Sequence, residues 1–374
     1  MVVALVSALL AVLLYTYAGY PILVTLLARL FPLRTADDAT FRPQVSVLIP
    51  VFNAAQFVRP KLDSLLAQDY PADRLEVLVY SDGATDGSDA IVAEYQQRHP
   101  GRVRLVRGEE RRGKPTALNR MRDEAKGELL VLTDIRQPLS ENAVRVLVER
   151  LADPRVGCAS GHLILRGATG AGFYWHYENA IRMSEARFRS MVGVTGPLYA
   201  MRKSDLPEVP LDTILDDMWI PLRLRLRGKL LTLCPEAIAW DQAFEDDREL
   251  GRKVRTLAGN YQIFSRLPRL LFPFANPIWF ETFSHKLLRL VCPWVLVALL
   301  VTSLAGAFMP RVAASGELWS LRVLVACEVA FIAAALIGAR AGRITGAART
   351  FVLLNWAAVV GLWRWMRGAQ RITW

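Results

Sequence analysis

The stretch LEVLVYSDGATDG, residues 75–87, decides the fold of this chain. Its first six residues are a nearly continuous apolar run, which is typical of a parallel strand that is buried on both faces. A second run of this kind, ELLVLTDIR at 128–136, also ends in acidic sequence. Acidic residues at the carboxyl ends of strands in an open α/β sheet face the crevice where ligands bind. The two runs therefore predict a nucleotide-handling enzyme with Asp82 and Asp134 at its site.

Strand and helix patterns alternate through the middle of the chain. The segment QVSVLIPV at 44–51 predicts a buried strand that stops at Pro50, and residues 103–107 predict another strand. Residues 57–68 have helical spacing of leucines, and a further helix is predicted from Thr116 onward. This alternation predicts an α/β domain built on a doubly wound, mostly parallel sheet.

The composition places this domain on a membrane. The chain has 374 residues, 53% of them hydrophobic, and a mean hydropathy of +0.23, which is too apolar for an ordinary soluble enzyme. Residues 2–28 carry no charge and are long enough to cross a bilayer of about 30 Å. A cleaved signal peptide fits poorly, because the positive start is missing and the apolar core is too long. Further apolar stretches lie at 290–309, at 323–338 with Glu328 inside it, and more weakly at 350–363.

The charge distribution indicates which kinds of partner this chain binds. The net charge is +11, and by the positive-inside rule the basic middle region is cytoplasmic. No nucleic-acid partner is expected, because the arginines are scattered rather than arranged in a stripe. Anionic membrane lipids and phosphate groups explain the excess positive charge better. The four cysteines have no paired spacing, so neither a disulfide framework nor a zinc site is indicated.

Seven short segments, taken in order, resemble the family 2 glycosyltransferases, the membrane-linked, inverting group with the GT-A fold. The resemblance covers roughly residues 43–260, and the order and spacing of the segments make it specific. The segments are VSVLIPVFN (45–53), SLLAQDYP (64–71), SDGATDGS (81–88), GKPTALN (113–119), VLTD (131–134), GPLYAMR (196–202) and ILDDMWIPLRL (214–224).

The resemblance and the apolar stretches together imply four parts. We expect an N-terminal transmembrane helix at 1–32, a cytoplasmic GT-A domain at 43–260, an interfacial amphipathic segment at 261–286, and a C-terminal region of two or three spans at 287–374. Four spans in all would place Arg364, Arg367 and Arg371 outside the cell, against the positive-inside rule. The side of the C-terminus therefore stays open at this stage, as does the oligomeric state.

The resemblance implies that one side of the crevice binds the nucleotide sugar. Asp82 is implied to contact the base and ribose, since a carboxylate accepts hydrogen bonds from the N–H and O–H donors of a nucleotide. Asp134 matches the first acid of the family's D-x-D motif, which holds Mg²⁺ or Mn²⁺ on the diphosphate. The third position is Arg136, which cannot ligate a metal but can bind phosphate directly. The remaining residues implied on this side are Pro50, Asn53, Lys114 and Arg255.

Asp217 matches the family's catalytic base, the last acid of its E-D or D-D motif. Asp216 beside it raises the pKa of the base by like-charge repulsion. A helix-capping role for either acid is compatible with this one, because a cap lies at a helix start beside a cleft. On the acceptor side the resemblance implies Trp219 and Arg202.

A later motif of the family, Q-x-x-R-W, is only partly present here. Arg255 matches its arginine, whereas Arg252 and Thr256 replace the glutamine and the tryptophan. The lost tryptophan lies beneath the acceptor sugar in processive synthases, so its absence argues against processivity. The alternative interpretation of the whole run is a basic amphipathic helix on the headgroup surface.

The resemblance implies inverting transfer of a sugar from a nucleotide-diphosphate sugar, with a UDP-sugar as the expected donor. The expected acceptor is a lipid-linked sugar or a polysaccharide at the cytoplasmic face of a bacterial inner membrane, in exopolysaccharide or cell-envelope synthesis. A processive synthase and a degenerate, non-catalytic scaffold are the alternatives. A Rossmann dehydrogenase is excluded, because no G-x-G-x-x-G follows the first strand.

Overall fold

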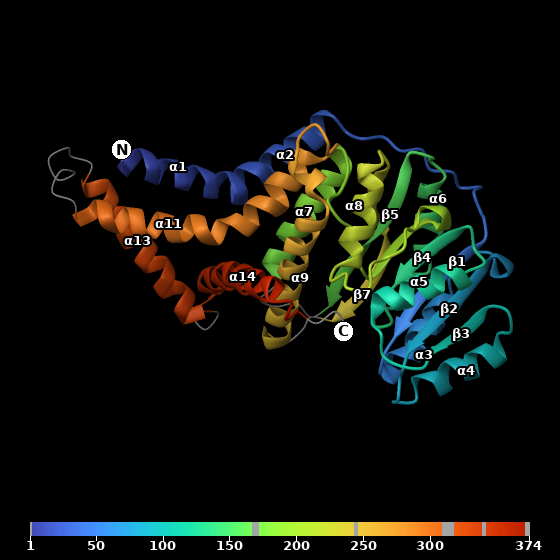
Figure 1. Ribbon diagram of the computed structural model, residues 1–374. Helices are drawn as coiled ribbons and strands as arrows, with labels where there is room; N and C mark the ends of the chain where they lie inside the picture. The colour runs from blue at the N-terminus through green and yellow to red at the C-terminus, as the bar shows by residue number, and fades with distance from the viewer. Residues whose placement is uncertain (1, 167–171, 243–245, 309–317, 339–341, 371–374) are drawn as a thin grey trace.

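The computed structural model describes residues 2–166, 172–242, 246–308, 318–338 and 342–370. A mixed sheet with its covering helices forms one end of the molecule, and long apolar helices form the other (Figure 1). Three helices, α7 (Gly172–Phe188), α8 (Asp216–Leu226) and α9 (Asp246–Arg266), stand between the sheet and the apolar helices.

The sheet has seven strands in the order β3-β2-β1-β4-β6-β5-β7. Neighbours among β1 to β4 are parallel, as are β5 and β7, whereas β6 runs antiparallel between β4 and β5. The predicted mostly parallel α/β sheet is confirmed. The bounds are β1 Val45–Val51, β2 Leu75–Asp82, β3 Val103–Gly108, β4 Leu129–Thr133, β5 Val156–Arg166, β6 Leu198–Arg202 and β7 Leu230–Gln242.

The first strand is longer than predicted. It does not stop at Pro50, because Pro50 pairs with Tyr80 and Val51 pairs with Ser81. β1 pairs with β4 only as far as Leu48. Beyond that residue, where Pro50 lies, β1 has no paired strand on its β4 side. Proline is tolerated there because no ladder bond needs its missing N–H.

Helices cover both faces of the sheet, which explains the continuous apolar runs. One face packs against α3 (Ala55–Leu66), α4 (Ser88–Arg98) and α6 (Ala143–Leu151). The other face packs against α5 (Lys114–Glu124), α8 and part of α9. Alternation along β1 shows the two cores: Val45, Val47 and Ile49 belong to the first, and Leu48 belongs to the second.

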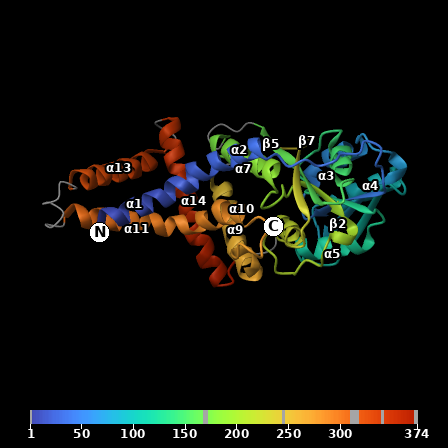
Figure 2. The same ribbon diagram turned by 90° about the horizontal axis from the view of Figure 1, so that it is seen from above.

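Four helices of the described residues are long and apolar enough to cross a membrane: Val2–Leu30, Trp279–Phe308, Trp319–Ile337 and Ile344–Met366. The first consists of α1 (Val2–Leu14), η1 (Tyr15–Gly19) and α2 (Tyr20–Leu30), and α1 runs beside α11 (Leu288–Phe308) in both views (Figures 1 and 2). The last two lie within α13 (Leu318–Ile337) and α14 (Arg343–Met366). Short elements complete the chain: η2 Ala72–Arg74, η3 Lys203–Asp205, η4 Pro268–Leu271, α10 Trp279–Glu281 and η5 Thr282–Leu287.

Two details refine the predicted division of the chain. Helix α9 continues to Arg266, so the expected boundary at 260 falls inside a helix, and the next apolar helix begins at Trp279. Glu328, within an apolar stretch, accepts a hydrogen bond of 2.7 Å from the Ser303 hydroxyl of α11. The polar partner of Glu328 is therefore a hydroxyl group on a neighbouring helix rather than a basic side chain.

Candidate functional site

Lys114 lies at the centre of the site and joins two acidic segments. It is the first residue of α5, and its Nζ lies 3.0 Å from Asp134 Oδ1 and 3.1 Å from Asp216 Oδ2. Asp134 follows β4, while Asp216 begins α8, so the lysine bridges segments about eighty residues apart in the chain. The structure therefore brings together three predicted site residues at the carboxyl edge of the sheet.

The charge state of Lys114 follows from these neighbours. Burial alone would lower the pKa of Lys114, but Asp134, Asp216 and Asp217 outweigh burial and raise it above its usual range. The ammonium group therefore stays protonated at any physiological pH. A fixed positive charge in a partly buried crevice is suited to binding the anionic oxygens of a diphosphate.

Asp217 has the environment of a proton acceptor. Burial, and then the neighbouring Asp216 carboxylate, raise the pKa of Asp217 to about 6, while Lys114 and Arg255 oppose the rise. A Cβ at Gly196 would lie 2.7 Å from Asp217 Oδ2, so a glycine is needed where the backbone meets this carboxylate. A carboxylate that titrates just below neutral pH combines the ionised form with useful basicity.

Asp82 lies at the predicted crevice but faces a loop. It ends β2, is fully buried, and accepts 2.8 Å hydrogen bonds from the backbone N–H groups of Arg112 and Gly113. Gly83 has a φ of +71°, and a Cβ there would lie 2.9 Å from Arg111 N. Asp82 therefore fastens the 109–113 loop against the end of the strand, which the sequence did not indicate.

Asn53 joins the first two loops of the crevice. It is the one non-glycine residue with positive φ (44°) among those described, and its Oδ1 accepts a 2.8 Å hydrogen bond from Thr85 N. The guanidinium of Arg111 lies 3.8 Å from the centre of the adjoining Phe52 ring. Loops 52–54, 83–86 and 109–113 thus form one connected rim, while Pro50 is buried in β1 beneath it.

Arg136 is paired with an acid that the sequence did not reveal. Its Nη2 donates a 2.5 Å hydrogen bond to Asp241 Oδ2, and Gln137 Nε2 donates to the same oxygen at 2.7 Å. Asp241 lies in β7, and its side chain is only 4% exposed. The predicted direct contact of Arg136 with phosphate would require exchange of this ion pair.

Lys61 is a second buried lysine beside the site. Its Nζ donates to Thr133 Oγ1 at 2.6 Å and to the Gln137 carbonyl at 2.5 Å. Burial lowers the pKa of Lys61 to about 7, and Asp134 opposes this shift. Sequence reasoning missed this residue because its position on α3 resembles that of an exposed helical lysine. It supports the strand end from which Asp134 projects.

The carboxylates can hold a divalent ion only with help from a ligand. Within the described residues, no three His, Cys, Asp or Glu side chains form a group that could bind a metal. Asp134 is the accessible carboxylate, with 37% of its side chain exposed, whereas Asp216 is 7% exposed. One carboxylate fits an ion whose other ligands are phosphate oxygens and water, which is a common arrangement for Mg²⁺.

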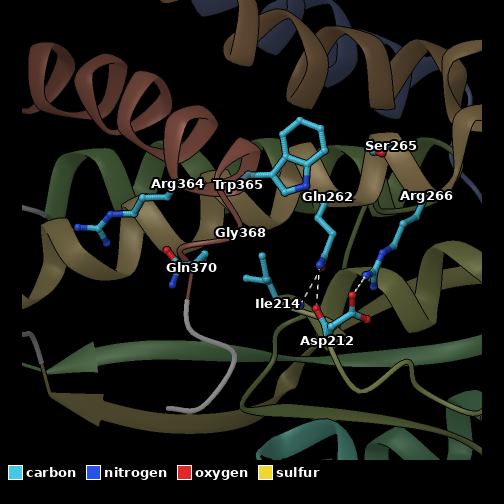
Figure 3. Close-up of a pocket in the computed structure, with 9 residues that line it drawn as sticks. All are labelled: Asp212, Ile214, Gln262, Ser265, Arg266, Arg364, Trp365, Gly368 and Gln370. Carbon is cyan, nitrogen blue, oxygen red and sulfur yellow. Dashed lines mark hydrogen bonds and ion pairs between the residues drawn. The ribbon is translucent and has the colours of Figure 1, made fainter.

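Helix α9 holds the segment that leads into the Asp216–Asp217 pair. Gln262 Oε1 accepts a 2.9 Å hydrogen bond from Ile214 N, and Gln262 Nε2 donates to the Asp212 carbonyl at 2.7 Å (Figure 3). Arg255 Nη2 donates to the Ile214 carbonyl at 3.1 Å. The Arg255 guanidinium, which was predicted to bind phosphate, therefore binds a backbone carbonyl in this structure. The i, i+7 spacing of Arg255 and Gln262 puts them on one helix face, a signal that could have identified Gln262.

A cavity of about 390 Å³ lies beside this contact, between α9 and the end of α14 (Figure 3). Its walls include the ion pair of Arg266 with Asp212. The segment before Asp216 and Asp217 thus lies between the sheet domain and the last apolar helix. The lining residues are Asp212, Ile214, Gln262, Ser265, Arg266, Arg364, Trp365, Gly368 and Gln370.

The two predicted acceptor-side residues are both held by other parts of the protein. Arg202 pairs with Leu129 at the start of β4, the opposite edge of the sheet from Asp134. Its guanidinium donates to the carbonyls of Leu151 at 2.5 Å and Val156 at 2.7 Å, which holds the end of α6. Trp219 is 3% exposed within the core, with the Arg223 guanidinium 4.7 Å from its ring centre. Arg202 is therefore not brought to the crevice, and Trp219 is buried in the core.

Comparison with known proteins agrees with this fold. Residues 46–208 match the family model described as Glycosyl transferase family 2. The mannosyltransferase PcManGT from Pyrobaculum calidifontis, solved in complex with GDP-Man and Mn²⁺, superposes with a TM-score of 0.76 at 26% identity. That match covers 98% of this chain and 99% of the other. The chain therefore carries a family 2 glycosyltransferase domain with the GT-A fold.

The curated relatives are named for different products. The chain is 24% identical over 233 residues to the poly-beta-1,6-N-acetyl-D-glucosamine synthase of Staphylococcus epidermidis, covering 59% of this chain and 56% of the relative. It is 27% identical over 208 residues to the beta-monoglucosyldiacylglycerol synthase of Synechocystis sp., covering 52% and 43%. The chain thus spans about half the length of the curated relatives it matches, and they do not specify its substrates.

Proposed function

We propose that this protein is an inverting glycosyltransferase that moves a sugar from a nucleoside-diphosphate sugar to a lipid-linked or polysaccharide acceptor. The observation that carries the proposal is Asp217, whose pKa burial and Asp216 raise to about 6, beside the permanently charged Lys114. A base and a fixed cation at one edge of the sheet are the two groups that glycosyl transfer requires.

The reaction follows from this arrangement. The Asp217 carboxylate accepts the proton of an acceptor hydroxyl, and the oxygen attacks the anomeric carbon of the donor. A new glycosidic C–O bond forms while the C–O bond to the diphosphate breaks on the opposite side, which inverts the configuration. Lys114 stabilises the negative charge that collects on the departing diphosphate, and Asp216 keeps the lysine in place through their 3.1 Å ion pair.

We propose Mg²⁺ or Mn²⁺ as the cofactor, held by Asp134 together with diphosphate oxygens and water. When bound, the ion supplies additional positive charge to the leaving group. The Mn²⁺ in the similar mannosyltransferase supports this proposal, as does the accessible Asp134 carboxylate. Arg136 is held by Asp241 and leaves the metal position to Asp134.

We also propose a donor class and a cellular placement. A UDP-sugar is the donor predicted from the sequence, whereas the similar mannosyltransferase was solved with GDP-Man, so both bases belong in any test. The four apolar helices support an integral membrane protein. We place the catalytic domain on the cytoplasmic face of a bacterial inner membrane, where nucleotide sugars are made and where the positive-inside rule puts a basic domain.

The test is turnover of the purified full chain with a panel of UDP- and GDP-sugars. We expect release of the nucleoside diphosphate from one donor, and a decrease of about 10²–10⁴-fold in Asp217→Asn. Nucleotide affinity in this variant should be nearly unchanged, because the base contacts the acceptor. Asp123→Asn, whose side chain is 64% exposed, is the matched control. Wild-type turnover by Asp217→Asn would remove this residue from the mechanism, and product length would separate single from processive transfer.

A further inference from the structure

The last apolar helix, α14, differs from the other three candidate spans. It is the least apolar of them, although its length would permit it to cross a bilayer. The proposed function makes this chain an integral membrane protein. If the first span, α11 and α13 all cross the membrane, the chain returns to the catalytic side at the end of α13. A fourth crossing by α14 would then carry residues 367–370 to the far side, away from the catalytic domain.

The end of α14 instead contacts the catalytic domain. The Trp365 ring stacks on Tyr261 of α9 with 6.2 Å between ring centres. A Cβ at Gly361 would lie 2.9 Å from Ala258 N, so the two helix backbones are in close contact. Residues 364–370 also help to line the cavity beside Asp212 and Ile214 (Figure 3). The last two turns of α14 therefore belong to the catalytic side.

The start and middle of α14 lie at the same end of the apolar helices. A Cβ at Gly338, just after α13, would lie 2.9 Å from Arg349 Cδ. The Phe351 ring packs edge-on against Tyr17, with 4.9 Å between ring centres. Tyr17 lies in η1, which leads into α2, and α2 packs through Tyr20 and Val24 on α7 of the catalytic domain. Figure 2 shows α14 crossing the direction of α1 and α11 rather than following it.

We propose that α14 is not a fourth span but lies along the membrane surface on the catalytic side, with its outer face in the lipid headgroup layer. The proposal rests on the membrane placement of the other three helices given above. It explains how the end of a long apolar helix lies against α9 while its middle packs on Tyr17, just before α2. It also returns Arg364 and Arg367 to the side that carries the basic domain, while Arg371 lies outside the described residues.

The outer face of α14 has the chemistry of a headgroup contact. Val352, Trp356 and Trp363 are 40%, 59% and 50% exposed, and helical spacing puts them on one stripe with Arg349 and Arg367. The Arg367 guanidinium lies 4.4 Å from the Trp363 ring centre. Tryptophan and arginine favour the interface, where an apolar body and a polar tip are both accommodated. The opposite face is buried and consists of Ala348, Asn355, Ala357, Ala358 and Gly361.

Single-cysteine reporters test this topology in the full chain. The background carries Cys327→Ser, since Cys158, Cys234 and Cys292 are buried. Ala369→Cys reports the end of α14, Glu110→Cys the catalytic domain, and Trp319→Cys the far end of α13. A membrane-impermeant maleimide is applied to sealed vesicles of each orientation.

We expect Ala369→Cys to label with Glu110→Cys, and Trp319→Cys to label only in the opposite orientation. Labelling of Ala369→Cys together with Trp319→Cys would overturn the proposal and make α14 a span. Labelling of Trp319→Cys in the same orientation as Glu110→Cys would also overturn the proposal, because it would show that α11 and α13 do not cross the membrane. The catalytic proposal is unaffected by either result, since it is measured by turnover.

Depth measurements give a second, independent result. Spin labels at Val352→Cys and Trp363→Cys, in phosphatidylcholine–phosphatidylglycerol vesicles, lie eleven residues apart and so about 16 Å apart along the helix. A surface helix keeps both labels within about 5–10 Å of the headgroup boundary. A depth difference near 16 Å would refute the surface position. Val323→Cys and Ile332→Cys on α13 are the control pair, for which a clear depth difference is expected.

Discussion

Gln262 is expected to position the catalytic base although it contacts neither substrate. It lies on α9, and its amide binds the Ile214 N–H and the Asp212 carbonyl just before Asp216–Asp217. Gln262→Leu removes both hydrogen bonds and leaves the N–H of Ile214, a residue only 4% exposed, without this partner. Each unsatisfied buried group costs about 1–3 kcal/mol, so the segment should shift to find water.

A displacement of the base by about 1 Å can lower the rate about 10²-fold. We therefore expect kcat of Gln262→Leu to fall about 10–100-fold, while the affinity for the nucleoside diphosphate changes less than about twofold. Steady-state kinetics and titration calorimetry on the same preparation measure the two quantities. Gln262→Glu should lose less activity, because its oxygen still accepts from Ile214 N. The control is Ser265→Ala, which alters the same cavity without touching the two bonds.

A wild-type kcat for Gln262→Leu would refute the positioning role, provided that Asp217→Asn is inactive. A merely structural role predicts a different pattern, in which thermal stability falls and the residual folded enzyme keeps its normal kcat and pH profile. Measuring the melting temperature beside kcat separates the two. Loss of activity in Gln262→Leu with full activity in Asp217→Asn would instead show that the base is another residue.

The remaining predictions concern pH, the metal and the Arg136 ion pair. Because the pKa of Asp217 is raised to about 6, kcat/KM should fall as pH drops through 6. Folding stability should instead decline as pH rises from about 4 to 6, because the native state holds the Asp217 proton to higher pH than the unfolded chain does. Asp217→Asn should remove this dependence of stability on pH. Excess EDTA should abolish turnover, and Mg²⁺ or Mn²⁺ should restore it in the wild type but poorly in Asp134→Ala; undiminished activity in EDTA would contradict the cofactor assignment. Arg136→Gln should destabilise the fold by about 3 kcal/mol in chemical denaturation, because it leaves the buried Asp241 carboxylate short of a charge partner. Arg112→Gln, from an exposed pair, should leave stability nearly unchanged.

The sequence alone determined the sheet and the class of protein. The runs that form β1, β2 and β4 are apolar enough to be recognised without a structure, because parallel strands are buried on both faces. Lys114, Asp134 and Asp217 were assigned from local motifs that lie at strand ends and helix starts. Such positions are fixed by neighbouring sequence, and the topology of an open sheet then brings them to one edge.

Only the tertiary structure decided which partner each charged group has. Asp241 meets Arg136 across a sequence separation of 105 residues, and Gln262 meets Ile214 across 48. Arg202 and Trp219 sit within matching motifs, yet the Arg202 guanidinium binds backbone carbonyls at the other edge of the sheet and Trp219 is buried in the core. The position of α14 is a result of the same kind, since its composition permits a span and only its contacts with α9 place its end. Local sequence specifies an element and its apolar face, whereas the partner of that face depends on the packing of the whole chain.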